Sequence, residues 1–114
     1  MFIKRIYLAF INSFKGIYRA LQEEFSFRIE FILATFLIPV SFFISDNVLE
    51  IILLSGSTLL ILLVELINTA IETTLNRVSL EENDLTKYAK DIGSGAVLIS
   101  LLIWLVTWAL IVIY

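Results

Sequence analysis

Hydrophobic positions gather into three long stretches, residues 26–45, 48–75 and 92–114, which short polar segments separate. A helix needs about 20 mostly apolar residues to cross a bilayer, and each stretch reaches that length. The third stretch follows the last charged residue of the chain, Asp91. The pattern therefore predicts three transmembrane helices in a single domain that covers residues 1–114.

The segment before the first stretch, residues 1–25, has a different pattern. Its apolar residues recur at spacings of three and four, which puts them on one face of a helix, and polar residues share another face. The apolar face holds Ile3, Ile6, Tyr7, Phe10, Phe14, Ile17, Tyr18 and Leu21, and the other holds Lys4, Arg5, Asn12, Lys15 and Arg19. An apolar face opposite a basic face is typical of a helix that lies in the membrane surface. The alternatives are an amphipathic core helix and a signal peptide, and Lys15 and Arg19 argue against the signal peptide because they interrupt its apolar run.

Composition excludes several classes of protein. Hydrophobic residues make up 60% of the 114 positions and charged residues 17%, whereas soluble domains have about 45–50% and about 25%. A chain this short could not bury so much apolar surface within itself, so a soluble monomer is excluded. The absence of Cys and His excludes disulfides, thiolate and histidine metal sites, and His-dependent catalysis. A net charge of -3 gives no support to a nucleic-acid partner.

The distribution of Lys and Arg predicts the orientation. Five of the eight basic residues lie within positions 1–28 and three lie within positions 77–90, between the second and third stretches. None lies in the turn at 45–50 or after position 91. Because cytoplasmic segments carry the excess of Lys and Arg, we expect a multi-pass protein whose N-terminus and 76–91 segment are cytoplasmic.

Four polar residues form a stripe within the second stretch. At 100° per residue, Glu65, Asn68, Glu72 and Asn76 fall on one side of a helix. Carboxylates at membrane depth are costly and usually mark a functional site. The alternative is a polar interface that holds helices together, but two carboxylates beside a charged segment favour a site.

Further polar residues flank the stretches at the same, cytoplasmic, end. They are Glu23, Glu24, Arg28 and Glu30 near the first stretch, and Glu81, Glu82, Asn83, Asp84, Lys87, Lys90 and Asp91 before the third. Carboxylates and amides without His or Cys suit a hard cation such as Mg²⁺, and Lys and Arg suit phosphate. This combination at a membrane surface is what phosphoryl transfer to a lipid hydroxyl requires, although the chain has no Walker motif or kinase glycine-rich loop.

A run of small residues, Gly93-Ser94-Gly95-Ala96, opens the third stretch. Such residues let helix backbones pack closely, and this is the interpretation we favour. The alternative is that the run brings backbone N–H groups close to a nucleotide at a helix N-terminus.

These motifs closely resemble the prokaryotic diacylglycerol kinase family. The segments that carry the resemblance are residues 65–72 (ELINTAIE), 89–91 (AKD) and 93–97 (GSGAV), and it extends without gaps from Arg5 to Trp108. The resemblance implies an all-α membrane protein with an N-terminal amphipathic surface helix and three transmembrane helices. It also implies a homotrimeric bundle whose active sites lie between protomers.

The resemblance also implies roles for individual residues. Glu65 corresponds to the general base and Asn68 to a polar residue that positions groups in the active site, while Glu24 and Glu72 correspond to the Mg²⁺ carboxylates. The nucleotide-binding positions are Arg5, Asn12, Glu24, Glu72, Glu81, Glu82, Asn83, Lys90 and Asp91. The lipid-substrate positions are Arg5, Arg28, Glu30, Glu65, Ser94 and Trp108. The chain departs from the family pattern at Asn76, usually Asp, at Asn83, often His, and at Asn12, aromatic in some relatives.

The implied function is Mg²⁺-dependent phosphorylation of diacylglycerol by ATP, which yields phosphatidic acid. It would take place at the cytoplasmic face of the bacterial inner membrane, in phospholipid recycling. A polyprenol substrate, as in undecaprenol kinase, is the alternative within this fold, and residues 76–78 and 93–95 favour the diacylglycerol branch. A small ion-coupled transporter is a distant alternative, because its carboxylate would lie near the bilayer midplane and these carboxylates cluster at one end.

Overall fold

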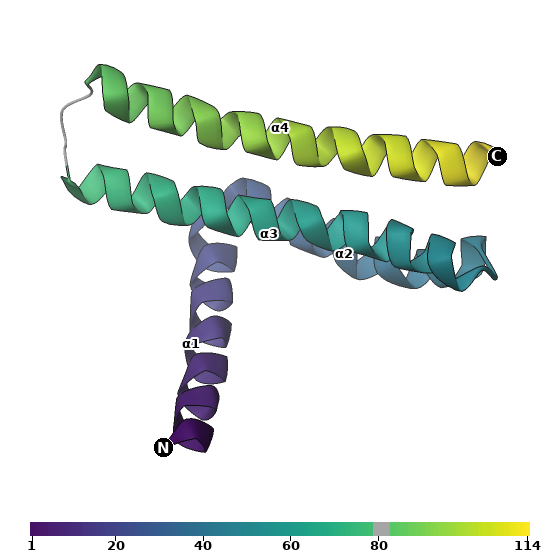
Figure 1. The fold of residues 1–114 in the computed structure, drawn as a ribbon, viewed down its shortest axis with the longest axis horizontal. Coiled ribbons are helices and arrows are strands. Elements are labelled where there is room, and N and C mark those ends of the chain that lie inside the picture. The colour runs from purple at the N-terminus through teal and green to yellow at the C-terminus, as the bar shows by residue number, and fades with distance from the viewer. Residues whose placement is uncertain (79–82) are drawn as a thin grey trace.

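The structure is a computed structural model that describes residues 1–78 and 83–114. All regular structure in these residues is helical: α1 (Phe2–Glu23), α2 (Phe25–Ile44), α3 (Val48–Val78) and α4 (Asp84–Ile113). Helices α2, α3 and α4 run side by side as an up-and-down bundle in which α3 packs against both of the others (Figure 1). Helix α1 leaves the bundle sideways. The all-helical fold predicted from the hydrophobic pattern is confirmed.

Three of the helices are long and apolar enough to cross a membrane: α2, α3 and α4. Helix α2 has 20 residues, whereas α3 has 31 and α4 has 30. At about 1.5 Å per residue, α2 matches a hydrocarbon core of about 30 Å, and α3 and α4 exceed it by about 15 Å. Because a tight turn joins α2 to the N-terminal end of α3, this excess projects at the end where α1 joins the bundle.

The helix ends correct two expectations, one about the third stretch and one about the second. Helix α4 begins at Asp84 rather than at residue 92, because the side-chain Oδ1 of Asn83 accepts a hydrogen bond of 2.9 Å from the N–H of Thr86. This is an N-cap, and Asp84 in the first turn complements the helix dipole. Likewise α3 continues to Val78 rather than ending at residue 75.

The small-residue run at 93–96 consequently lies in the third and fourth turns of α4 instead of opening it. Its backbone N–H groups are used within the helix, so the alternative of a nucleotide site at a helix N-terminus is wrong there. Close packing is confirmed at Gly93, which is buried against α3.

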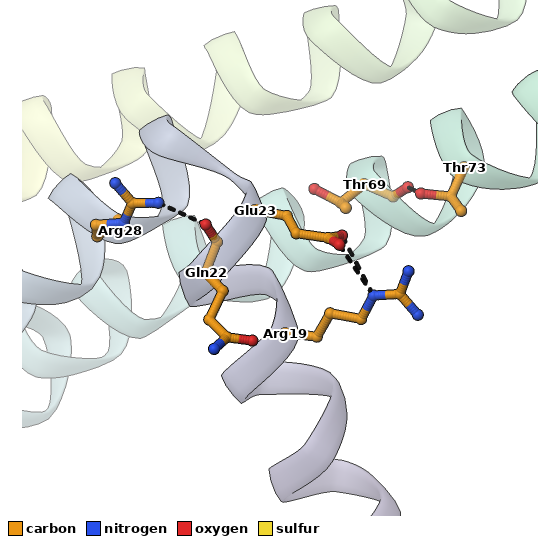
Figure 2. Close-up of polar contacts among 6 residues, drawn as sticks. All are labelled: Arg19, Gln22, Glu23, Arg28, Thr69 and Thr73. Carbon is orange, nitrogen blue, oxygen red and sulfur yellow. Dashed lines mark hydrogen bonds and ion pairs between the residues drawn. The ribbon is translucent and has the colours of Figure 1, made fainter.

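A single residue, Glu24, separates α1 from α2 with an extended backbone conformation (φ -106°, ψ 110°). The Arg28 guanidinium reaches back across this bend and donates hydrogen bonds to the carbonyl oxygens of Leu21 (2.8 Å) and Gln22 (2.7 Å) (Figure 2). Carbonyls at a helix end have no partner within the helix. Arg28 therefore caps α1 and fixes the direction in which it leaves the bundle.

Hydrogen bonds between helices hold the half of the bundle that lies away from α1. The indole N–H groups of Trp104 and Trp108 both donate to Thr58 Oγ1, at 3.2 and 3.3 Å, and Trp108 also donates to the Leu54 carbonyl oxygen at 3.2 Å. The Ser41 and Ser55 hydroxyls lie 3.0 Å apart between α2 and α3. In a lipid environment such groups have no water as an alternative partner, so these contacts set the register of the helices.

We predict that Thr58→Val destabilises the bundle, because it removes the shared acceptor of both tryptophans. Hydrogen bonds between membrane helices contribute up to about 1–2 kcal/mol, so we expect the free energy of unfolding in detergent to fall by about 1 kcal/mol. Thr35→Val is the matched control, since Thr35 is exposed and its hydroxyl bonds only to the Phe31 carbonyl of its own helix. Equal losses in the two variants would show that the tryptophan contacts contribute nothing.

Candidate functional site

Four half-buried carboxylates come together where α1 joins α2 beside α3. Glu24 is the junction residue, Glu30 lies in the second turn of α2, and Glu65 and Glu72 belong to α3. The Glu65 side chain contacts that of Glu30 and is close enough to Glu24 and Glu72 to interact with their charges. The structure thus gathers acidic residues that are up to 48 positions apart in the sequence around the α1–α2 junction and the adjoining part of α3.

Asn68 lies between the two α3 carboxylates and is hydrogen-bonded to one of them. Its Nδ2 donates to Glu72 Oε1 at 3.2 Å. One turn beyond Glu72, Asn76 Oδ1 accepts a hydrogen bond of 2.9 Å from Lys90 Nζ of α4. The polar stripe predicted along α3 therefore exists as one continuous face, and its outer end is tied to α4.

The other site residues predicted between positions 81 and 94 belong to the first turns of α4 or precede that helix. Lys90 is half-buried through its contact with α3, whereas Asp91 is exposed and pairs with Lys87 at 3.4 Å. Ser94 is exposed. The Asn83 side chain serves as the N-cap of α4. Glu81 and Glu82 lie outside the described residues.

A groove runs between α1 and α3 and ends at the acidic cluster. It consists of two adjoining hollows of about 430 and 210 Å³, which share Gly16, Ala20 and Thr69 as lining residues. Asn12 lines the larger hollow, and Glu24 lines the smaller one. The smaller hollow is also lined by Arg19 and Glu23 of α1 and by Thr69 and Thr73 of α3, which Figure 2 shows on neighbouring helices. Asn12 therefore lies beside a cavity that leads to the carboxylates.

Three of the expected site residues are not brought to the cluster within one chain. Arg5 lies near the far end of α1, about 28 Å from Glu24 along the helix at 1.5 Å per residue. Trp108 is buried at the level of Leu54, about 16 Å from Glu65 by the same rise. Arg28 lies next to the junction, but its guanidinium is engaged by α1 carbonyls.

The carboxylates of the cluster are the groups available to bind Mg²⁺. Among the described residues, no three acidic side chains are grouped closely enough to hold a metal ion on their own. Mg²⁺ in phosphoryl-transfer sites is usually held by one or two carboxylates together with substrate phosphates and water. Two half-buried carboxylates, Glu24, which lines the groove, and Glu72, fit that kind of binding.

Two features of the site were not expected from the sequence. The groove residues Gly16, Ala20, Thr69 and Thr73 are small or weakly polar, and the only available signal was their spacing of four positions on each helix. The second feature is the contact between Gly93 and Asn68, which the sequence did not predict. It depends on the register of α4 against α3, which hydropathy does not encode.

Comparison with known proteins shows the family of this chain. The family model described as prokaryotic diacylglycerol kinase matches residues 11–112. This chain belongs to the prokaryotic diacylglycerol kinase family. It is 43% identical over 111 residues to a diacylglycerol kinase of Pseudomonas aeruginosa (97% of this chain, 90% of the relative) and 42% identical over 96 residues to that of Haemophilus influenzae (84% and 81%). The Escherichia coli diacylglycerol kinase is 33% identical over 107 residues (94% and 88%).

Membership in this family confirms the resemblance that the ELINTAIE, AKD and GSGAV segments indicated. Together with the three helices that are long and apolar enough to cross a bilayer, it identifies the chain as an all-helical membrane protein of a kinase family.

Proposed function

We propose that this protein phosphorylates diacylglycerol with ATP and Mg²⁺ and releases phosphatidic acid and ADP. The observation that carries the proposal is the convergence of Glu24, Glu30, Glu65, Asn68 and Glu72 where α1 joins α2 beside α3. Relatives named diacylglycerol kinase match most of the chain. Their name is the basis for proposing diacylglycerol as the lipid substrate.

The depth of the two α3 carboxylates supports different roles for them. Glu72 lies seven residues, about 10 Å, further along α3 than Glu65, toward the projecting end that Lys90 flanks. The hydroxyl of diacylglycerol lies at the boundary between lipid and water, and phosphates lie outside it. Glu65 is therefore suited to the lipid and Glu72 to the nucleotide.

In this mechanism Glu65 accepts the proton of the lipid hydroxyl as its oxygen attacks the γ-phosphorus of ATP. A new P–O bond to the lipid forms, and the bond from the γ-phosphorus to the oxygen of the leaving ADP breaks. General-base assistance lowers the barrier because the alcohol loses its proton as the bond forms. Glu30, in contact with Glu65, completes the side of the site that faces the lipid.

Glu24 and Glu72 would hold Mg²⁺ together with the phosphates of ATP. The ion supplies positive charge that offsets the charge of the transferred phosphoryl group. Lys90 adds a second cation at the projecting end. Asp91 follows Lys90 in α4 and Asn83 caps the start of that helix, and the groove from Asn12 to Glu24 leaves space for the nucleotide.

A homotrimer with sites between protomers is part of the proposal. Arg5 lies about 28 Å along α1 from its own cluster, so an Arg5 that contacts nucleotide must serve the site of a neighbouring protomer. A second protomer would also cover the polar face of α3, which is costly to expose to lipid.

The proposed location is the bacterial inner membrane. Helix α1 leaves the bundle sideways (Figure 1), which suits a helix lying in the membrane surface with its apolar face in the lipid. The basic residues lie on α1, at the start of α2, near the end of α3 and in the first turns of α4, which are the segments that meet at or extend from the acidic end of the bundle. By the positive-inside rule this end, with the N-terminus and the site, faces the cytoplasm, where ATP is available.

The first test is a direct assay of the purified protein in micelles with Mg²⁺ and ATP labelled on the γ-phosphate. We expect label in phosphatidic acid when diacylglycerol is supplied, and loss of that label when EDTA removes the metal. Undecaprenol in a parallel reaction separates the two lipid alcohols. Preferential labelling of undecaprenol would replace the proposed substrate, and labelling of neither lipid would refute the kinase activity.

Conservative substitutions should separate the two α3 carboxylates. Glu65→Gln removes the proton acceptor, so we expect kcat to fall by about 10²–10⁴ without recovery at high Mg²⁺. Glu72→Gln removes a metal carboxylate, so raising Mg²⁺ should restore part of its activity. The measurement is kcat as a function of Mg²⁺ concentration. Recovery of Glu65→Gln alone would reverse the assignment, and near-normal rates in both variants would make the stripe structural.

Sharing of sites between protomers predicts complementation. Arg5→Gln and Glu65→Gln should each be inactive, and oligomers reassembled from both should regain activity, because some sites then combine an intact Arg5 from one protomer with an intact Glu65 from another. The matched control mixes Glu65→Gln with Glu72→Gln, whose lesions lie on one helix and should not complement. Restored activity in the control, or none with Arg5→Gln, would contradict the shared site.

A further inference from the structure

Gly93 is the one described glycine whose missing side chain is required by its surroundings. A Cβ built there would overlap Asn68 Oδ1 and lie 3.1 Å from Asn68 Cγ, whereas Gly95, in the same helix, has no other group within 4 Å of such a Cβ. Gly93 is buried where α4 meets α3. Helix α4 therefore needs glycine at residue 93 to leave room for one particular side chain.

The Asn68 amide is constrained on both sides. Its Nδ2 donates to Glu72 Oε1 at 3.2 Å, and its Oδ1 is fully buried and has no hydrogen-bond partner among the described residues. A carboxylate can only accept hydrogen bonds, so the amide must turn its NH₂ group toward Glu72 and its oxygen toward Gly93. The position of α4 thus determines where the donor to Glu72 lies.

A displaced Asn68 has no equally good place to go. The hollow beside it, about 130 Å³, is lined by apolar side chains such as Val64, Ile67 and Ile71. An amide that moved into this hollow would also lose the partner of its NH₂ group, Glu72, and would leave both polar atoms unsatisfied in apolar surroundings. Staggered rotamers leave few other directions on a helix. Any group larger than hydrogen at residue 93 would therefore remove the donor from Glu72.

We propose that Gly93 is a positioning residue of the active site: it lets Asn68 stand against α4 and hold the Glu72 carboxylate in one orientation toward the metal and nucleotide. This inference rests on the proposed function, in which Glu72 is a metal carboxylate. Residues that orient a metal ligand typically contribute 10–100-fold to metal affinity or activity. Gly93→Ala should have an effect of that size although it touches neither substrate.

The structural half of the proposal can be tested without activity. The chain has five Asn residues, so selective ¹⁵N-asparagine labelling in micelles gives a simple NMR spectrum of side-chain amides. Asn68→Ala identifies the Asn68 pair by its loss. We expect Gly93→Ala and Glu72→Gln to shift this pair, and Gly95→Ala to leave it in place. An unchanged Asn68 pair in Gly93→Ala, or an equal shift in Gly95→Ala, would overturn the proposal.

The functional half is a comparison of Mg²⁺ requirements. In Gly93→Ala we expect the Mg²⁺ concentration for half-maximal activity to rise 10–100-fold, with the KM for diacylglycerol changed less than twofold, because only the orientation of Glu72 is altered. Gly95→Ala should behave as the wild type, because a Cβ at this position meets no other group within 4 Å. It controls for helix propensity, since Ala favours the helix more than Gly at both positions. A proportional loss at all Mg²⁺ concentrations would refute the orienting role.

A double variant separates positioning from general packing. In an Asn68→Ala background the overlap is gone, so adding Gly93→Ala should change activity less than twofold. If Gly93→Ala alone fails to fold, the double variant should fold as Asn68→Ala does, and a double variant that remains unfolded would overturn the proposal. If the wild type phosphorylates no lipid, the proposed function fails, whereas the amide spectrum still decides whether Gly93 positions Asn68.

Discussion

Polar groups within a bilayer must find their partners inside the protein, because the lipid offers none. The contacts between α2, α3 and α4 follow from this constraint. In the half of the bundle away from α1, Thr58 accepts hydrogen bonds from two tryptophans. At the other end the Asn68 amide group donates to Glu72, whereas its oxygen, which packs against Gly93, has no hydrogen-bond partner among the described residues. Burial of apolar surface alone does not select one register of these helices, since lipid tails are as apolar as the side chains.

The register set by these bonds also fixes the candidate site. The tryptophan contacts align α4 with α3 such that Gly93 comes opposite Asn68 and Lys90 reaches Asn76. Arg28 performs the corresponding task for α1, since it caps that helix across the bend at Glu24. The acidic cluster is therefore positioned by two sets of contacts that its carboxylates do not make themselves. Changes remote from the carboxylates can consequently alter the site.

Hydropathy located the membrane-crossing segments but not the ends of the helices. A span ends where apolar residues end, whereas a helix continues as long as its backbone is satisfied and its ends are capped. Asn83 supplies such a cap and extends α4 two turns beyond the apolar stretch. As a result, the polar segment expected between the spans lies partly in a helix, and Lys90 meets α3 from a rigid element.

The sequence by itself determined the helical fold, the three spans and the stripe from Glu65 to Asn76, because each depends only on the order of residues along a helix of known period. It also determined the family, through the segments around Glu65, Lys90 and Gly93. The tertiary structure alone decided which groups meet: Glu30 with Glu65, Arg28 with the end of α1, and Gly93 with Asn68. Those contacts depend on how helices are rotated and shifted against one another, and many registers satisfy the same hydrophobic pattern. Only the matching of individual polar groups and one missing side chain selects among them.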